Sequence, residues 1–108
     1  MIPSFCIILT TTNDKQIAEQ IASELLENSL AACLQIDNII SYFKWEGKIN
    51  SEKEYRIMIK ARADNYNEIE KVIVKIHNYD LPQILKLAII DGLPEYLKWL
   101  ADPSIYTI

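Results

Sequence analysis

The residues best suited to bind a metal ion are one histidine and two cysteines. His77 is the only histidine of the chain, and it follows a segment with helical periodicity. Its neutral imidazole could bind a transition metal, or the residue could simply cap the last carbonyl groups of that helix. Cys33 and Cys6 carry soft thiol ligands, but both lie in apolar segments, as buried free thiols in a reducing compartment usually do. We therefore take His77 as the candidate metal ligand and Cys33 as a candidate for a ligand-binding cleft.

The spacing of these residues does not predict a closed metal site. Neither cysteine belongs to a CxxC pair, and the chain contains no HxxxH spacing. Such pairs are the usual signature of structural zinc sites. Tight binding of a metal ion would therefore need ligands that converge from several subunits.

Two charged residues, Glu54 and Lys60, lie in a segment that alternates like a strand. They share one face, because the apolar residues Tyr55, Ile57 and Ile59 occupy the positions between them. This polar face could line a cleft between subunits and bind a ligand. It could equally form an ion pair between subunits and contribute only to packing.

No arrangement of residues in the sequence predicts catalysis. Nucleophilic and acid–base catalysis require a serine, cysteine or carboxylate placed beside a base, and no segment supplies such a pair. We therefore expect a binding protein and not an enzyme.

Size and composition indicate one globular domain over residues 1–108. Half of the residues are hydrophobic, which is enough for a core without metals or cross-links. The net charge of -4 and the pI of about 4.9 argue against a nucleic-acid partner. No apolar stretch could span a bilayer, and the start of the sequence lacks the pattern of a secretory signal. We expect a cytoplasmic protein with no membrane partner.

The first two elements that position these residues are a strand and a helix. Residues 2–11 are apolar and β-branched and predict a strand. Asn13, with Gln16 three positions later, resembles a capping box, and residues 14–28 repeat apolar positions every three or four residues. A strand therefore leads into an amphipathic helix.

A long hairpin follows. Residues 31–46 and 52–62 predict two strands, and residues 47–51 predict the turn between them. The apolar residues of the first arm change phase near its middle, which predicts either a bulge near Asp37 and Asn38 or burial of both faces.

The remaining pattern completes the fold prediction. Residues 65–76 predict a helix, residues 84–90 a strand and residues 93–100 a short helix with Pro94 in its first turn. The order β-α-β-β-α-β with an extra C-terminal helix predicts an α+β, ferredoxin-like fold. It consists of a four-stranded antiparallel sheet with the first two helices on one face.

The hairpin also predicts a homo-oligomer. Its arms exceed the five or six residues of a typical strand, so the tip must project beyond the core. The projecting part carries Tyr42, Phe43, Trp45 and Ile49. Such apolar side chains beside open sheet edges are best covered by other copies of the chain.

Several segments together resemble one known family. They are Ala31-Ala32-Cys33, the run from Tyr42 to Ile49, Glu54, Lys60, the run from His77 to Pro82, and the run from Glu95 to Leu100. In this order and spacing they resemble the CutA family of divalent-cation-tolerance proteins, over essentially the whole chain.

The resemblance implies a PII-like homotrimer in the bacterial cytosol with a role in the response to metal ions, most often copper. It implies no required cofactor and no defined reaction, and it groups Trp45, Tyr79 and His77 with Glu54 and Lys60 in a cleft. Three hypotheses follow. In the first, the trimer binds copper, zinc or another divalent ion; in the second, it senses a small molecule and acts on a partner protein, as PII proteins do. In the third, the trimer is mainly structural and its effect on metal tolerance is indirect.

The sequence departs from the family pattern at three positions. One bacterial form of the metal site has a cysteine and two adjacent histidines, where this chain has Thr10, Ile76 and His77. Gln83 replaces the usual glutamate after Pro82. Only His77 is left of the three ligands, and a neutral amide replaces a carboxylate that could bind a cation.

Overall fold

The computed structural model describes residues 4 to 105. In chain order the elements are β1 (Phe5–Thr12), α1 (Lys15–Glu27), β2 (Cys33–Trp45), β3 (Lys48–Arg62), the 3-10 helix η1 (Ala63–Asn65), α2 (Tyr66–Ile76), β4 (Ile84–Ile89), α3 (Pro94–Ala101) and the 3-10 helix η2 (Pro103–Ile105). The start of the predicted first strand, residues 2 and 3, lies outside the described residues.

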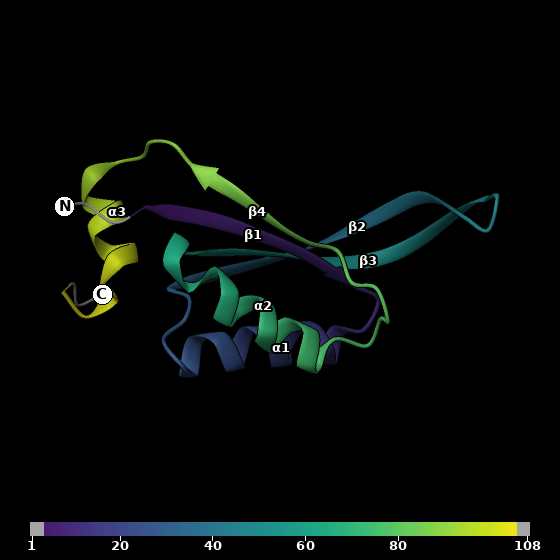
Figure 1. Cartoon of the computed structure of the whole chain (residues 1–108), viewed down its shortest axis with the longest axis horizontal. Helices are drawn as coiled ribbons and strands as arrows, with labels where there is room; N and C mark the ends of the chain where they lie inside the picture. The colour runs from purple at the N-terminus through teal and green to yellow at the C-terminus, as the bar shows by residue number, and fades with distance from the viewer. Residues whose placement is uncertain (1–3, 106–108) are drawn as a thin grey trace.

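The four strands form one antiparallel sheet in the order β2-β3-β1-β4. Helices α1 and α2 pack together beneath one face of the sheet, while α3 lies at the end farthest from the hairpin tip (Figure 1). This arrangement confirms the predicted ferredoxin-like fold with an additional C-terminal helix.

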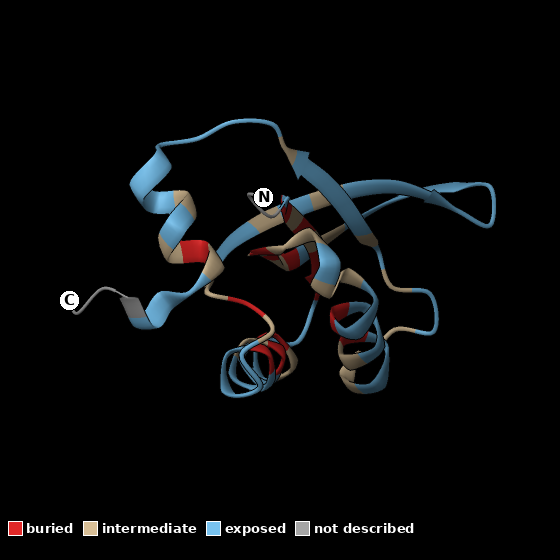
Figure 2. Cartoon of the chain, turned by 60° about the vertical axis from the view of Figure 1, so that its left-hand side comes forward, coloured by how far each residue is buried: buried red, intermediate tan, exposed pale blue. Residues whose placement is uncertain are grey.

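The core lies between the sheet and these two helices. Its fully buried side chains include Ile8 of β1, Ile59 of β3, Ile21 of α1 and Ile69 of α2. Buried residues gather where α1, α2 and the central strands face one another, and the hairpin is exposed (Figure 2). Each aliphatic side chain buried in this way contributes roughly 1.5–3 kcal/mol, so the apolar stripes of the two helices fix their position on the sheet.

The start of α1 differs from the prediction. Asp14, not Asn13, caps the helix, because Asp14 Oδ1 accepts hydrogen bonds from the backbone N–H groups of Gln16 (2.9 Å) and Ile17 (3.4 Å). The Asn13 side chain instead donates to Glu52 Oε1 over 2.7 Å. The capping box predicted at Asn13 and Gln16 is therefore wrong.

The hairpin turn is also shorter than predicted. Glu46 and Gly47 both have positive φ (53° and 76°), as a two-residue type I′ turn requires. The pairing from Cys33↔Lys60 to Trp45↔Lys48 is unbroken. The predicted turn over residues 47–51 is wrong, because polar residues in this region continue an exposed strand.

Neither explanation for the phase change in β2 holds within the chain. The continuous register leaves no room for a bulge near Asp37. Ile40 and Phe43 point to opposite faces and are both exposed. The outer part of β2 has no layer packed on either side of it within the chain, so its sequence need not alternate.

The hairpin gives the molecule its elongated shape, with extents of 48 × 26 × 24 Å. Its tip extends well beyond α1 and α2 (Figure 1). Tyr42 and Ile49, near the tip, are 75% and 78% exposed. Among the described residues, no helix is long and apolar enough to cross a membrane.

Candidate functional site

The site is built around the loop between α2 and β4, and His77 fixes the start of that loop. The His77 backbone N–H donates to the Ile73 carbonyl oxygen over 2.8 Å and so terminates α2. In the side chain, Nδ1 accepts from the backbone N–H of Tyr79 (3.0 Å), and Nε2 lies 2.8 Å from the carbonyl oxygen of Thr11. Since that carbonyl can only accept, Nε2 carries the ring proton.

Both ring nitrogens of His77 are thus engaged within the chain. A metal ion at either nitrogen would have to replace one of these two hydrogen bonds. The backbone N–H of His77 bonds to the end of the helix, but among the described residues the imidazole bonds to no carbonyl group of α2. The imidazole instead holds the loop against the end of β1. Its role as a metal ligand stays a prediction.

Tyr79 connects this loop to β3. Its ring lies 4.8 Å from the His77 ring, centroid to centroid, and its hydroxyl donates to Glu54 Oε2 over 2.7 Å. Burial, followed by the hydrogen bond to the Glu54 carboxylate, raises the pKa of Tyr79 well above its ordinary value. Tyr79 therefore stays a neutral hydrogen-bond donor, and Glu54, which is only 8% exposed, is its acceptor.

A chain of side-chain amides supports the same corner. The Thr12 hydroxyl donates to Asn78 Oδ1 (2.6 Å), and the Asn78 amide donates to Asn13 Oδ1 (2.8 Å). Asn13 in turn donates to Glu52 Oε1 over 2.7 Å. These bonds join the end of β1, the loop and the β3 strand, so the two carboxylates of β3 are held by donors from two other segments.

These residues border a groove of about 650 Å³ between the hairpin and the loop. It is lined by Thr11, Ser41, Tyr42, Phe43, Trp45, Glu52, Glu54, Tyr79, Asp80, Leu81 and Gln83. Its lining thus combines three carboxylates with four aromatic rings. None of these carboxylates forms an ion pair with a lysine or arginine of residues 4 to 105.

The groove brings together part of the predicted site. Trp45, Glu54 and Tyr79 line the groove. His77 is not among the lining residues, but its ring packs against the ring of Tyr79. The grouping of Trp45 with Glu54 follows from the hairpin register, which places both on the face opposite the helices.

Cys33 and Lys60 lie elsewhere in the chain. They pair with each other across β2 and β3, six positions from Glu54, or about 20 Å along the strand. The Lys60 ammonium lies 3.4 Å from the Tyr96 hydroxyl and 5.5 Å from the centre of its ring, so it packs on α3. Cys33 is a partly buried free thiol. Their place in a shared cleft stays a prediction that needs a second subunit.

Glu52 and Asp80 also line the groove, although neither was predicted from the sequence. Glu52 lies two positions before Glu54, and strand alternation alone places both on one face. Asp80 had no such signal, because its position depends on the path of the loop. Tyr42 and Phe43 were noted only as exposed aromatic residues, although they also line the groove.

The three departures from the family pattern have separate environments. Thr10 is fully buried on the helix side, and its hydroxyl has no hydrogen-bond partner among the described residues. Ile76 packs against the core. Gln83 Oε1 accepts from the Thr11 hydroxyl (3.4 Å) at the groove. Within the described part of the chain, no three His, Cys, Asp or Glu side chains lie close enough together to hold a metal ion.

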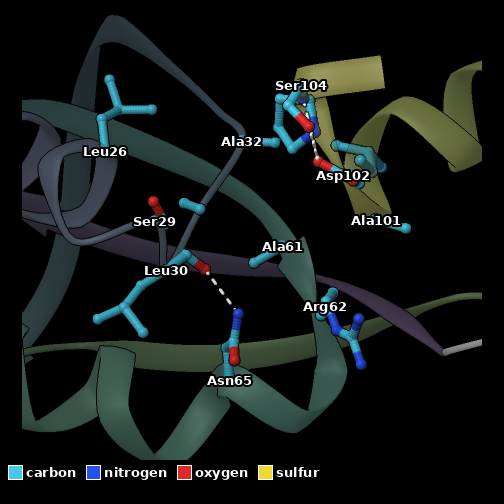
Figure 3. A pocket seen from close by; sticks show the side chains of 13 residues that line it. Leu26, Ser29, Leu30, Ala32, Ala61, Arg62, Asn65, Ala101, Asp102 and Ser104 are labelled. Carbon is cyan, nitrogen blue, oxygen red and sulfur yellow. Dashed lines mark hydrogen bonds between the residues drawn. The ribbon is translucent and has the colours of Figure 1, made fainter.

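A second cavity, of about 390 Å³, lies between the end of α1 and the C-terminal elements (Figure 3). Most of its polar side chains already have partners. Arg62 forms two hydrogen bonds with the Asp64 carboxylate, Asn65 donates to the Leu30 carbonyl, and Ser104 donates to Asp102. The groove at Glu54 is therefore the stronger candidate site.

The fold and this groove define a small ferredoxin-like α+β protein with an acidic, aromatic groove between a projecting hairpin and the α2-β4 loop. Residues 6–103 match the sequence model of the CutA1 divalent ion tolerance protein family. The chain belongs to this family, as its motifs predicted.

Two relatives match over nearly their full length. The divalent-cation tolerance protein CutA of Archaeoglobus fulgidus is 39% identical over 95 residues, which cover 88% of this chain and 93% of that protein. The protein of the same name from Pyrococcus horikoshii is 35% identical over 98 residues, covering 91% and 96%.

Solved structures agree with the fold. The periplasmic divalent cation tolerance protein CutA from A. fulgidus has a TM-score of 0.87 at 36% identity and covers 94% of this chain and 99% of that one. CutA1 from Shewanella sp. SIB1 has a TM-score of 0.86 at 35% identity, covering 93% and 94%.

Proposed function

We propose that this chain contributes to the tolerance of divalent metal ions as a cytoplasmic homotrimer that binds its ligand without catalysing a reaction. The observation that carries the proposal is the family match over residues 6–103. The absence of a nucleophile beside a base in the sequence also supports a binding protein. Cell fractionation tests the location, because one relative is described as periplasmic.

The trimer is supported by surfaces that a single chain leaves uncovered. β2 and β4 are the two edges of the sheet, and the outer half of β2 has unpaired backbone groups along its free side. The hairpin tip exposes Tyr42, Trp45 and Ile49, and β4 exposes Leu85 and Leu87. Burial of apolar surface stabilises by about 25 cal/mol per Å². The association of copies would therefore be favoured, because it removes these apolar side chains from water.

Light scattering of the purified protein at micromolar concentration tests this assembly. We expect three times the chain mass of 12.5 kDa. A mass of 12.5 kDa that persists as the concentration rises contradicts the trimer.

The metal ion of this proposal, copper or zinc, binds where subunits meet. Glu52, Glu54 and Asp80 supply carboxylate oxygens at the groove, and His77 lies behind it. Within residues 4 to 105 of one chain, no three metal-binding side chains lie close together. The coordination therefore needs groups from a neighbouring subunit. No other cofactor is required.

Calorimetric titration of metal-free protein with Cu(II), Zn(II) and Cu(I) tests direct binding. We expect saturation near one ion per subunit, with binding weakened in His77→Ala and in Glu54→Gln. Unchanged binding in both variants would place the ion elsewhere, and no binding in the wild-type protein would make the role in metal tolerance indirect.

A second candidate function is a PII-like regulatory module that senses a small molecule and acts on a partner protein. The volume of the groove and its four aromatic rings favour this function, because aromatic side chains are poor metal ligands but good contacts for organic molecules. A rise in melting temperature with an organic metabolite, and none with metal ions, would favour it over the first.

A further inference from the structure

The two ring nitrogens of His77 differ in what they say about its role. Nε2 donates to the carbonyl oxygen of Thr11 over 2.8 Å, and Nδ1 accepts the backbone N–H of Tyr79 over 3.0 Å. A histidine that ligates a metal ion also donates its other ring N–H to a carbonyl or a carboxylate, so the bond to Thr11 fits either role. The bond to Tyr79 separates the two roles, because it occupies the lone pair that a metal ion would need.

The carbonyl group of Thr11 determines which nitrogen has that lone pair. A carbonyl oxygen only accepts hydrogen bonds, so Nε2 carries the ring proton and Nδ1 is the acceptor. The end of β1 therefore sets the tautomer of His77, and the tautomer sets the contact with Tyr79. A metal ion at Nδ1 would displace the Tyr79 N–H, and an ion at Nε2 would displace the proton that bonds to Thr11.

His77 also contacts the side chain of Tyr79. The imidazole and phenol rings pack with their centroids 4.8 Å apart and their planes inclined at 55°. Tyr79 is thus held at its backbone N–H and at its ring by the same residue. These two contacts together restrict the direction in which the Tyr79 hydroxyl points.

The Tyr79 hydroxyl extends this restraint to a carboxylate. It donates to Glu54 Oε2 over 2.7 Å. A hydrogen bond to an ionised carboxylate is stronger than a bond between neutral groups, so it holds the orientation of the Glu54 side chain. Any loss of order at His77 should therefore reach Glu54 through Tyr79.

All three hydrogen bonds lie within one chain. They join the end of β1, the α2-β4 loop and β3, and none of them depends on whether the groove is open. A neighbouring subunit that covers the hairpin, or that brings a cation to Glu54, would add contacts to these residues without supplying any of the three bonds.

We propose that His77 is a positioning residue, which holds Tyr79 and through it the Glu54 carboxylate in the orientation that binds the metal ion, and is not itself a ligand. This inference rests on the first candidate function, metal binding at the groove, and assigns His77 its part in that function. The carboxylate of Glu54 contacts the ion, and the imidazole stays behind Tyr79.

Calorimetric titration of variants with Zn(II) tests this role. His77→Ala removes all contacts of the ring and should weaken Zn(II) binding about tenfold or more, as losses behind a metal ligand do. His77→Asn restores an acceptor for the N–H two residues later, as in an Asx turn, and should recover most of that loss. A side-chain amide is a poor ligand for zinc, so direct ligation predicts the same loss in both variants, and that result would overturn the proposal.

Asn65→Ala controls for a general loss of stability. The Asn65 side chain donates to the Leu30 carbonyl at the opposite end of α2 from His77. Its removal costs a hydrogen bond but leaves the path to Glu54 intact, so Zn(II) binding should be unchanged. Weakening equal to that of His77→Ala would overturn the proposal.

Nitrogen-15 NMR reports on the imidazole directly, because His77 is the only histidine of the chain. In the metal-free protein we expect one protonated ring nitrogen and one acceptor. Saturation with Zn(II) should leave both resonances near these positions. A large shift of either resonance on saturation would identify a coordinated imidazole and overturn the proposal.

A double-mutant cycle in the metal-free protein distinguishes this inference from metal binding itself. If His77 orients Tyr79, the substitution Tyr79→Phe should lower the free energy of unfolding no more than about half as much in His77→Ala as in the wild-type protein. Additive losses would overturn the positioning role. If the wild-type protein binds no Zn(II) but shows this coupling, the metal function is wrong and His77 still positions Glu54. Zn(II) binding with a shifted imidazole resonance would do the reverse.

Discussion

The hydroxyl of Tyr79 donates a 2.7 Å hydrogen bond to Oε2 of Glu54, although the two residues lie 25 positions apart in the chain. The bond joins the α2-β4 loop to the middle of β3 and forms one wall of the groove. Burial is the largest cause of the raised pKa of Tyr79, and this hydrogen bond to Glu54 is the second.

Tyr79→Phe should destabilise the protein at neutral pH. The substitution keeps the ring but leaves the buried Glu54 carboxylate without its donor, which costs about 1–3 kcal/mol in the free energy of unfolding. Urea unfolding at pH 7 measures the difference. A variant as stable as the wild-type protein would mean that water replaces the hydroxyl without cost.

The same pair predicts a dependence on alkaline pH. The pKa of Tyr79 is raised in the folded state above its ordinary value of 10.0, so the folded protein holds a proton that the unfolded chain releases. The contribution is complete below pH 10 and declines as the pH rises further. The stability difference between wild-type protein and Tyr79→Phe should therefore be constant up to pH 10 and narrow as the pH rises above 10, as urea titrations at each pH would show. A constant difference would contradict the assignment.

His77→Ala should destabilise the protein even when all metal has been removed. The substitution deletes the acceptor for the Tyr79 N–H and the donor to the Thr11 carbonyl, at a cost of about 1–3 kcal/mol. Thermal unfolding in excess EDTA measures this loss. Equal stability in EDTA, with a difference only after copper or zinc is added, would instead identify His77 as a metal ligand alone.

Much of the fold could be predicted because apolar spacing records which side of an element is buried. Ile21 and Leu25 of α1, and Ile57 and Ile59 of β3, follow helical and strand periods and face one core. The hairpin tip could not be predicted in the same way. Its residues face no protein layer within the chain, so their polarity carried no information on where the strand ended.

The residue pattern of β3 predicted which side chains share a sheet face, but it did not predict which of them lie together in one site. Alternation along β3 placed Glu54 and Lys60 on one face, but a shared face does not imply a shared site, and Lys60 packs on Tyr96 instead. The partners of His77 could not be inferred, because Thr11 lies 66 positions away and is reached only once the loop is folded. The family motifs grouped Trp45, Glu54 and Tyr79, and all three line one groove, but their role in binding a ligand stays a prediction.

Substitutions in the hairpin turn should change stability in opposite directions. Gly47 has φ of 76° and no atom within 4 Å of an added Cβ, so Gly47→Ala meets only backbone strain, about 1 kcal/mol. Glu46 also has positive φ, and Glu46→Asn should stabilise by about 0.5 kcal/mol, because asparagine adopts this conformation more readily. Chemical unfolding of both variants at one protein concentration tests the turn. Destabilisation by both would contradict the two-residue geometry.

Two threonines of β1 offer a matched test of buried hydroxyl groups. The Thr10 hydroxyl is fully buried without a hydrogen-bond partner among the described residues, whereas the Thr12 hydroxyl donates to Asn78 Oδ1 and accepts from the Asp14 N–H. Thr10→Val replaces an unsatisfied polar group by a methyl group of similar shape and should stabilise by about 1 kcal/mol.

Thr12→Val removes two satisfied hydrogen bonds from an equally buried position and should destabilise by about 1–3 kcal/mol. Since both substitutions exchange the same atoms on the same face of one strand, differences in β propensity cancel between them. Calorimetric melting temperatures should therefore move in opposite directions. A decrease for Thr10→Val would show that its hydroxyl bonds to a group beyond the described residues, such as a buried water molecule or a neighbouring subunit.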